Sequence, residues 1–367
     1  MANITKFFDC YIPITSCNLR CGYCYIAQQK RFNDPLPRFE HTAIEIGKAL
    51  SLKRLGGECY FNLCAGGETL LSPNVIEITK VLLEEGHYVS LITNGTLTRR
   101  IEELCHFPIE LKKRLHIKFS FHYLELKRLG IVQEYFENVR NARLSGISIT
   151  VELTPCDEEI PYIDEMKKFC LENVGALCHV SVARKEDDLR KEIPVLTNLS
   201  REEYLNTWGT FNSCMFDFKM QTFPYKRREF CYAGEWSFSL DLGSGDYRQC
   251  VIGKRLGNVF EDYEKPLNTE PIGKHCPLAQ CFNGHAYLAL GDIPEIEAPP
   301  YSEIRNRTCS DGTEWLSKDV RDFFSSKLYE KNAEWGRGKK ALFELKHVAH
   351  KTVKTGKKWI LQLLQGK

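Results

Sequence analysis

The chain has little net charge, no long apolar run and no internal repeat, and each absence argues against a class of protein. Its 367 residues include 50 lysines and arginines against 48 aspartates and glutamates, so no overall positive field favours a nucleic-acid partner. No apolar run reaches the ~18–20 residues of a membrane-spanning helix. Residues 1–8 lack the charged and then apolar layout of a secretion signal. We therefore expect a cytoplasmic protein with roughly two domains.

Cysteine, by contrast, is plentiful, with 16 residues in the chain. Such a number can indicate a disulfide scaffold in a small secreted domain. This chain is not small, however, and its densest cysteine groups have the spacing of metal ligands. We therefore expect a reducing compartment in which thiolates are available to bind metal.

Three of these cysteines lie close together just after the first apolar run. Cys17, Cys21 and Cys24 are spaced C-x3-C-x2-C, so that one loop can wrap a single metal centre. A tetrahedral zinc site would want a fourth protein ligand nearby. A cubic iron–sulfur cluster can accept three cysteines and leave one iron open to a small molecule. A zinc knuckle and chance clustering remain the alternatives to an iron–sulfur site.

The triplet, with Tyr23 before its last cysteine, resembles the signature of the radical S-adenosylmethionine (radical SAM) superfamily. The resemblance implies that Cys17, Cys21 and Cys24 bind a 4Fe–4S cluster and that Tyr23 lies at the SAM cofactor. It also implies reductive cleavage of SAM to a 5′-deoxyadenosyl radical, which takes hydrogen from an unactivated C–H bond. The electron would come from a donor such as flavodoxin or ferredoxin.

Short apolar runs alternate with longer amphipathic stretches as far as about residue 185. This alternation predicts βα units around a parallel sheet, and on its own it predicts only an α/β protein. The resemblance implies more, namely the open (β/α)6 partial barrel of radical SAM cores over residues 1–185. We expect strands at 7–14, 58–63, 88–92, 116–121, 148–153 and 179–183, and helices at 40–55, 72–85, 99–104, 132–144 and 162–173.

The pattern changes after Lys185. We expect a bridging segment over 186–230, a small α+β cluster-binding domain over 231–310 and a basic helical tail over 311–367. The end of the tail mixes lysines with apolar residues. Contact with a membrane surface or an anionic partner is one interpretation of it, and a helix packed on the protein is the other.

Candidate cofactor contacts lie near the carboxyl ends of the predicted strands. Gly66, Gly67 and Glu68 resemble the family's Gly-Gly-Glu motif, in which the glycines let the backbone approach SAM and the carboxylate faces its amino group. A simple turn at Asn94-Gly95 and an exposed cation at Arg128 are the alternatives there. The further contacts that the resemblance implies are Thr93, Asn94, Ser120, Arg128, Glu152 and Thr154.

Four later cysteines carry a separate signal. Cys231 and Cys250 belong to a C-x13-G-x4-C pattern, and Cys276 and Cys281 to a C-x4-C pattern. A hairpin turn at 243–246 would bring Cys250 back beside the strand that carries Cys231. The set resembles the auxiliary-cluster extensions called SPASM and, when shortened, Twitch. The cysteines are too few for the full SPASM pattern, which implies one auxiliary 4Fe–4S cluster, with structural zinc as the alternative.

A fully ligated second cluster carries electrons rather than substrate. We therefore expect a radical SAM oxidoreductase that dehydrogenates a sugar, a cyclitol or another small hydroxylated substrate, with His122 as candidate proton acceptor. A packed histidine is the alternative for His122. The first strand begins within about ten residues, which would leave no room for an N-terminal recognition domain of the kind that many peptide-modifying relatives carry. A maturase of ribosomal peptides, a redox-neutral epimerase and a zinc-binding adaptor remain the other functions.

Overall fold

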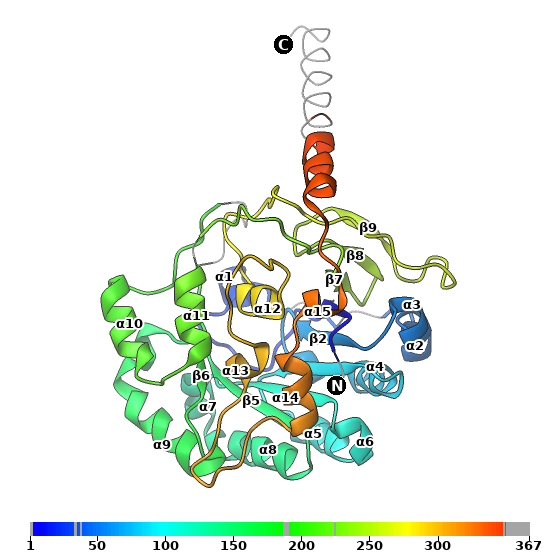
Figure 1. Ribbon diagram of the computed structural model, residues 1–367. Helices are drawn as coiled ribbons and strands as arrows, with labels where there is room; N and C mark the ends of the chain where they lie inside the picture. Colours follow the sequence, from blue (N-terminus) through cyan, green and yellow to red (C-terminus); the bar gives the residue numbers. More distant parts are fainter. Residues whose placement is uncertain are drawn as a thin grey trace, which may run out of the picture.

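The apolar runs between residues 6 and 180 become neighbouring parallel strands of one sheet in the computed structural model (Figure 1). The structure describes residues 3–32, 35–36, 39–185, 191–223, 225–347 and 349. The basic end of the predicted tail, residues 350–367, lies outside these ranges, as do residues 186–190 of the predicted bridging segment. The strands are β1 (Lys6–Ile12), β2 (Cys59–Ala65), β3 (Tyr88–Thr93), β4 (Leu115–Ser120), β5 (Ser148–Leu153), β6 (His179–Val180), β7 (Ser237–Asp241), β8 (Asp246–Arg248) and β9 (Arg255–Asn258).

The sheet has nine strands in the order β6-β5-β4-β3-β2-β1-β7-β8-β9. Strands β1 to β6 are parallel, which confirms the predicted α/β core. Strand β7 also pairs in parallel with β1, with Phe7 opposite Ser237, and β8 and β9 follow as antiparallel strands. The C-terminal half of the chain therefore extends the sheet of the core.

Helices follow most strands and alternate with them along the chain, as the amphipathic stretches predict. They are α1 (Tyr25–Gln28), α2 (Ala43–Ala49), α3 (Leu52–Leu55), α4 (Asn74–Glu84), α5 (Thr98–Cys105), α6 (Ile109–Lys112), α7 (Tyr123–Leu129), α8 (Val132–Leu144), α9 (Ile163–Val174), α10 (Arg201–Gly209), α11 (Cys214–Thr222), α12 (Gly284–Leu290), α13 (Tyr301–Arg305), α14 (Lys318–Ser325) and α15 (Leu328–Lys331), with 3-10 helices η1 (Thr69–Leu71) and η2 (Asp157–Tyr162).

The single helix predicted at 40–55 is wrong, because two short helices occupy this stretch. Thr42 caps α2 and forms a capping box with Glu45, so α2 begins at Ala43. The carbonyl of Leu50 bonds the ring Nε2 of buried His87 at 2.7 Å. The backbone leaves the helical conformation at Ser51, before α3 begins.

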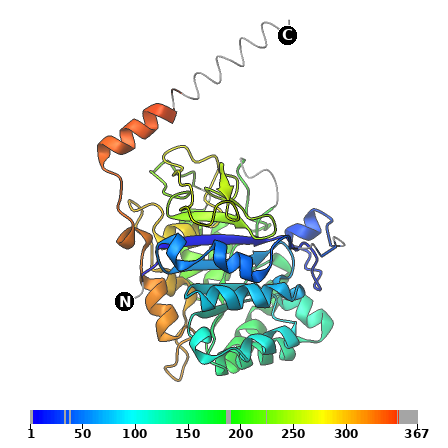
Figure 2. The same ribbon diagram turned by 90° about the vertical axis from the view of Figure 1, so that its right-hand side faces the viewer.

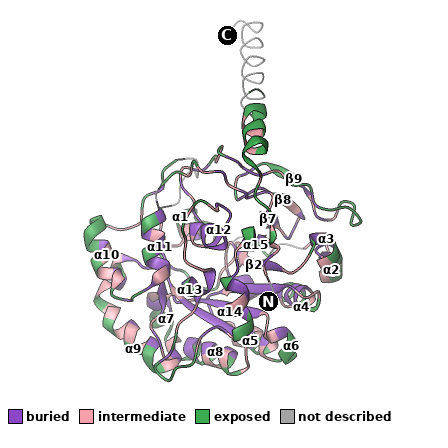
Figure 3. Cartoon of the chain, in the orientation of Figure 1, coloured by how far each residue is buried: buried purple, intermediate pink, exposed green. Residues whose placement is uncertain are grey.

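The sheet is covered on both faces. Helices α4, α5, α8 and α9 lie along the outside of the curved sheet, and α12, α13 and α14 lie inside the curve (Figures 1 and 2). Inside, Tyr88 stacks on Phe323 with ring centroids 3.7 Å apart, and Tyr60 packs on Phe324 at 4.8 Å. The strands are consequently buried along most of their length (Figure 3).

Part of the predicted tail closes the bottom of the sheet. Strand β6 is only two residues long, and the backbone N–H of Ile149 in β5 bonds the carbonyl of Trp315 at 3.0 Å. The N–H of Ile4, before β1, bonds the hydroxyl of Ser326 at 3.1 Å. No helix in the described ranges is both long and apolar enough to cross a bilayer.

Candidate active site

The loop that carries Cys17, Cys21 and Cys24 leaves the carboxyl end of β1. The N–H of Cys24 bonds the carbonyl of Cys21 at 3.2 Å, and the N–H of Leu19 approaches the Cys17 sulfur at 3.4 Å. Cys24 then caps α1, whose helix begins at Tyr25. The three predicted cluster ligands thus lie on one tight turn directly above the sheet.

The Gly-Gly-Glu turn after β2 packs against this loop. The N–H of Gly67 bonds the carbonyl of Ile14 at 2.6 Å, and the N–H of Glu68 bonds the carbonyl of Ser16 at 2.9 Å. A Cβ on Gly67 would lie 1.9 Å from the carbonyl oxygen of Ser16, so only glycine fits. The two predicted cofactor motifs are therefore joined backbone to backbone.

Glu68 binds the turn that follows β3 through its side chain. Its carboxylate accepts hydrogen bonds from the hydroxyl of Thr93 at 2.7 Å, the N–H of Asn94 at 2.7 Å and the N–H of Leu70 at 2.9 Å. Burial raises the pKa of Glu68, while these hydrogen bonds lower it. The amide of Asn94 also lies 3.8 Å from the Cys17 sulfur. The structure thus brings Glu68, Thr93 and Asn94 together beside the cysteine loop.

The thiols of Cys17 and Cys21 are protonated when no metal is bound, because burial raises the pKa of both. Burial raises the pKa of Cys17 to about 11, and burial and then the neighbouring Cys24 and Cys17 raise that of Cys21 further. Thiolates bind iron, so cluster assembly must release protons. Nowhere in the described ranges do three or more Cys, His, Asp or Glu side chains converge closely enough to hold one metal ion. The thiols of a cubane surround a larger body than one ion, and these three are close enough to perturb one another's pKa.

A cleft of about 490 Å³ opens beside the loop, within the size range of cofactor sites. Its lining includes Cys21, Tyr23, His122, Cys156 and Asn198. The hydroxyl of Tyr23 lies 2.6 Å from Nδ1 of His122. Burial lowers the pKa of His122 to about 4, so the imidazole is neutral at pH 7. Tyr23 and His122 therefore form one wall of a cleft that could hold SAM.

Arg128 reaches the cysteine loop only through another residue. Its guanidinium pairs with the carboxylate of Glu125 at 2.7 Å, and its side chain is 60% exposed. Glu125 also accepts the backbone N–H of Arg20, within the loop, at 2.9 Å. Ser120 ends β4 and Thr154 follows β5, both half-buried. Arg128 is thus placed to position the loop through Glu125.

Glu152 lies inside the curve of the sheet. Its carboxylate pairs with Nη1 of Arg305 at 2.6 Å. Burial opposes ionisation of Glu152, but the charges of Arg305 and Lys219 outweigh burial and lower its pKa to about 2. The structure thus gives Glu152 an ion-pair partner 153 positions further along the chain.

The second cysteine set converges beside the sheet. Burial raises the pKa of Cys250 to about 12, with a further contribution from Cys276. Burial, and then Cys250 and Cys276, hold the pKa of Cys281 well above its usual range, while Cys231 is perturbed by both Cys281 and Cys250. All sixteen cysteines lie in the described part of the chain, and none is joined to another by a disulfide.

The predicted turn at 243–246 is confirmed as the link between β7 and β8. Gly245 has a φ of 79°, and the N–H of Gly243 bonds the carboxylate of Asp241 at 2.8 Å. The prediction that Cys231 lies on the paired strand is wrong. Cys231 precedes β7 and instead forms an isolated bridge with Gly273, because both of its backbone groups bond that residue at 3.0 Å.

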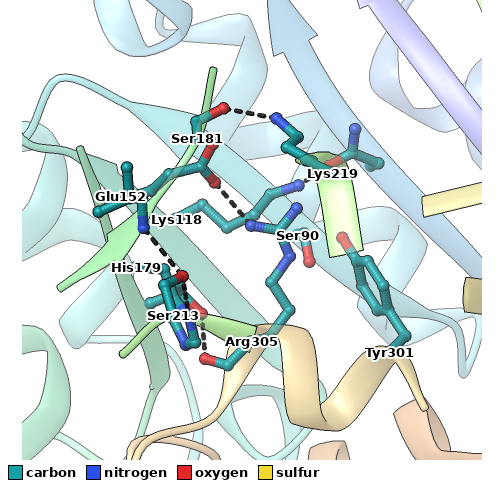
Figure 4. A network of polar contacts seen from close by, with 12 residues as sticks. Ser90, Lys118, Glu152, His179, Ser181, Ser213, Lys219, Tyr301 and Arg305 are labelled. Atoms are coloured by element: carbon teal, nitrogen blue, oxygen red, sulfur yellow. Dashed lines mark hydrogen bonds and ion pairs between the residues drawn. The ribbon is translucent and has the colours of Figure 1, made fainter. Parts of the chain in front are cut away.

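Sequence reasoning missed a group of cations inside the sheet: Lys118, Lys219 and Arg305 (Figure 4). Lys118 could have been found, because it is a charged residue on the inward-facing register of β4, between Ile117 and Phe119. Lys219 and Arg305 come from stretches without clear periodicity. Their place inside the sheet depends on how α11 and α13 pack.

Comparison with known proteins gives a family and two distant relatives. The sequence model of the radical SAM superfamily matches residues 11–170. A Methanocaldococcus jannaschii protein named as a glycyl-radical enzyme activating enzyme is 30% identical over 79 residues, 22% of this chain and 28% of its own length. The subtilosin biosynthesis protein AlbA of Bacillus subtilis is 22% identical over 296 residues, 73% of this chain and 64% of AlbA.

Among solved structures, Streptococcus suis SuiB bound to its precursor peptide SuiA aligns with a TM-score of 0.47 and 17% identity. That alignment covers 72% of this chain and 64% of SuiB. The chain thus spans less than two thirds of the length of each of these three proteins. The match over residues 11–170, which contain both the cysteine loop and the Gly-Gly-Glu turn, shows that this part of the chain is a radical SAM domain, and the cofactors of that superfamily are SAM and a 4Fe–4S cluster.

Proposed function

We propose that this chain is a radical SAM oxidoreductase that removes a hydrogen atom and then an electron from its substrate. The observation that supports this most is the convergence of Cys231, Cys250, Cys276 and Cys281 beside the sheet. Four cysteine ligands suit an auxiliary 4Fe–4S cluster of the SPASM or Twitch type without an open iron. When bound, SAM and its cluster supply a 5′-deoxyadenosyl radical, and the auxiliary cluster supplies an electron acceptor.

The residues that bind SAM and its cluster would lie at one end of the interior, and those that bind the auxiliary cluster at the other. Cys17, Cys21 and Cys24 would hold the first cluster, and Gly66, Gly67 and Glu68 would hold the methionine part of SAM. At the other end, Cys281 lines the same small cavity as Lys219 and His285. A substrate inside the sheet would therefore lie between the two predicted clusters, with protein around it to exclude water.

For the substrate we propose a sugar, a cyclitol or another small hydroxylated molecule. The interior offers groups that suit hydroxyls, because Asn62 bonds Asp9 at 2.8 Å and Asn283 bonds the same carboxylate at 2.9 Å. Maturation of a ribosomal peptide is the second candidate, supported by the likeness to AlbA over 73% of this chain. A flavodoxin or ferredoxin in the cytoplasm would supply the reducing electron.

The test separates hydrogen abstraction from oxidation. We expect Cys276→Ser with Cys281→Ser to keep forming 5′-deoxyadenosine while losing the oxidised product, because the substrate radical then lacks its electron acceptor. The substrate would come from a panel of cyclitols, aminocyclitols and short peptides, assayed anaerobically in deuterated solvent. Cys105→Ser, a half-buried cysteine on α5, is the matched control.

Unchanged product yield in the double variant would contradict the proposed electron transfer. Deuterium returned to the substrate by the wild-type protein, with inverted stereochemistry, would instead indicate an epimerase. A protein that takes up zinc, shows no iron–sulfur absorption and leaves SAM intact would be an adaptor and not an enzyme.

A further inference from the structure

Positive charge accumulates inside the sheet, on the side of the predicted auxiliary site. Lys118 on β4, Lys219 on α11 and Arg305 on α13 point toward one another (Figure 4). Arg184, just after β6, lines the same cavity as Lys219, with its guanidinium 5.2 Å from the Phe282 ring. Four cations thus come together from four separate segments of the chain.

The described carboxylates nearby do not balance the charges of Lys118, Lys219 and Arg305. Glu152 pairs with Arg305, and Asp9 is bonded by the amides of Asn62 and Asn283 and by Tyr287. Among the described residues, no carboxylate lies within ion-pair distance of the ammonium of Lys118 or of Lys219. Within the described part of the chain, Glu152 is the one carboxylate paired with any of Lys118, Lys219 and Arg305, so these three cations carry an excess of positive charge in a largely buried space.

The hydrogen-bonding capacity of the cations is only partly used. Lys118 is 4% exposed and donates to the amide oxygen of Asn62, while Lys219 donates to the hydroxyl of Ser181. An ammonium has three donors, so each lysine retains capacity for a further acceptor. Arg305 is 1% exposed, and its Nε is buried without a hydrogen-bond partner in the structure.

The titration of the neighbouring groups reflects the same excess of charge. Burial lowers the pKa of Lys219 to about 8, and Arg184, Arg305 and Lys118 lower it further against Glu152. Burial and then Lys219, Arg305, Lys118 and Arg184 hold the pKa of His285 well below its usual range. An anion placed among these groups would therefore be attracted by Lys118, Lys219 and Arg305.

We propose that Lys118, Lys219 and Arg305 form a binding site for an oxyanion of the substrate, either a carboxylate or a phosphate group. Burying unpaired cations is costly, and a bound oxyanion would offset that cost with charge-assisted hydrogen bonds. The Glu152 side chain, which pairs with Arg305, is 19% exposed, so the carboxylate end of this ion pair is in contact with solvent. The proposal rests on the proposed function for the identity of the ligand as substrate, but the site itself requires no turnover.

The site also narrows the substrate class. A neutral sugar would leave the positive charge of the site unbalanced, whereas a sugar acid, a sugar phosphate or a peptide carboxylate would neutralise it. Bound there, the anionic end would fix the rest of the substrate between the two predicted clusters. The three cations are thus positioned to select the substrate by charge rather than to take part in hydrogen abstraction.

The test measures binding, without catalysis, on anaerobically reconstituted protein by titration calorimetry. The probes are succinate, inorganic phosphate and neutral myo-inositol, each with and without saturating SAM. The variants are Lys118→Met and Lys219→Met, which keep length and remove charge, and Lys219→Arg, which keeps charge. Lys80→Met, an exposed lysine paired with Glu84, is the matched control.

We expect wild-type protein, Lys219→Arg and Lys80→Met to bind one of the two anions at least about tenfold more tightly than either methionine variant. Tighter binding of succinate would show that the site takes a carboxylate, and tighter binding of phosphate would show that it takes a phosphate group. If Lys118→Met fails to fold, Lys219→Met carries the comparison, because Lys219 is only half-buried. Radical chemistry that fails while anion binding persists would overturn the proposed function and leave this site intact.

Three results would overturn the site. One is the same affinity for both anions in wild-type protein and in the methionine variants, which would show an adventitious ion only. Another is no measurable binding of either anion to wild-type protein. The third is competition between SAM and the probe, because these cations would then hold the carboxylate of the cofactor.

Discussion

Arg305 on α13 donates to the carboxylate of Glu152 on β5 at 2.6 Å, and its own carbonyl accepts the hydroxyl of Thr150 at 2.7 Å. Arg305 thus bonds two inward-facing residues of β5, Thr150 and Glu152. Its side chain is 2% exposed, so the pair lies in a low-dielectric interior. The pair ties the C-terminal helices to the sheet.

Removing one partner of this pair should destabilise the protein. We expect Glu152→Gln to lower the free energy of unfolding by about 3 kcal/mol, because Arg305 would keep a buried charge without its carboxylate. Chemical unfolding monitored by circular dichroism measures the change. The control Glu110→Gln, with a side chain 72% exposed, should stay within about 0.5 kcal/mol of wild type. Equal stability of both variants would show that the pair contributes nothing net.

The same pair predicts a dependence on pH. The pKa of Glu152 is lowered to about 2 in the folded protein, against ~4.3 for an unfolded glutamate. A carboxylate whose pKa is lowered by folding stabilises the folded protein at pH values above its unfolded pKa. This stabilisation is lost as the pH falls through the folded pKa. The stability difference between wild type and Glu152→Gln should therefore be constant from pH 7 to about 5 and shrink below about pH 4. A difference that grows on acidification would have the wrong sign.

Each cysteine of the first loop should be required for SAM cleavage. We expect Cys17→Ala, Cys21→Ala and Cys24→Ala each to abolish 5′-deoxyadenosine formation, because two thiolates do not hold the cluster that the loop is spaced for. Chromatography of anaerobic, dithionite-reduced reactions measures it. Cys170→Ala, a buried cysteine on α9, should keep cleaving SAM. Normal cleavage in any loop variant would contradict the ligand assignment.

The contact between Gly67 and Ser16 predicts that an added methyl group is disruptive. A Cβ there would lie 1.9 Å from a backbone oxygen, so Gly67→Ala must push the turn away from the cysteine loop. We expect at least about tenfold weaker SAM binding, equivalent to ~1.4 kcal/mol. Equilibrium dialysis with labelled SAM measures it. Gly209→Ala, where an added Cβ meets nothing within 4 Å, is the control and should bind normally.

Metal content should report the two cysteine sets independently. We expect about eight irons in the reconstituted wild-type protein and about four after joint replacement of Cys231, Cys250, Cys276 and Cys281 by alanine. That variant should still cleave SAM, though slowly. Iron and zinc analysis alongside electron paramagnetic resonance measures both sets. Zinc in the second site, or no loss of metal, would exclude an auxiliary iron–sulfur cluster.

Local patterns predicted the core and its first motifs well. Short continuous apolar runs located the strands β1 to β5 to within about two residues, because burial on both faces favours such runs in parallel sheets. The cysteine loop and the Gly-Gly-Glu turn could be predicted because each is continuous in sequence. The break at Leu50 was not, since it depends on a side chain, His87, from a later segment.

Long-range pairing accounts for what the sequence did not predict. Nothing local to residues 237–241 indicates that β7 adds in parallel to β1. The ion pair of Arg305 and Glu152 likewise depends on where α13 docks. Lys118 was overlooked although its place on β4 indicates that it points inward. Attention to charged residues within apolar strands would have found it.

The pairing of β1 with β7 also bears on how the protein is made. On the ribosome β1 emerges more than 200 residues before β7, and the edge of β1 that pairs with β7 stays open until residue 241 has been synthesised. An open edge of this kind invites pairing with other chains, and parallel pairing over such a separation is slow. We therefore expect the nascent core to depend on a chaperone, or on slow translation, until β7 has been synthesised and pairs with β1.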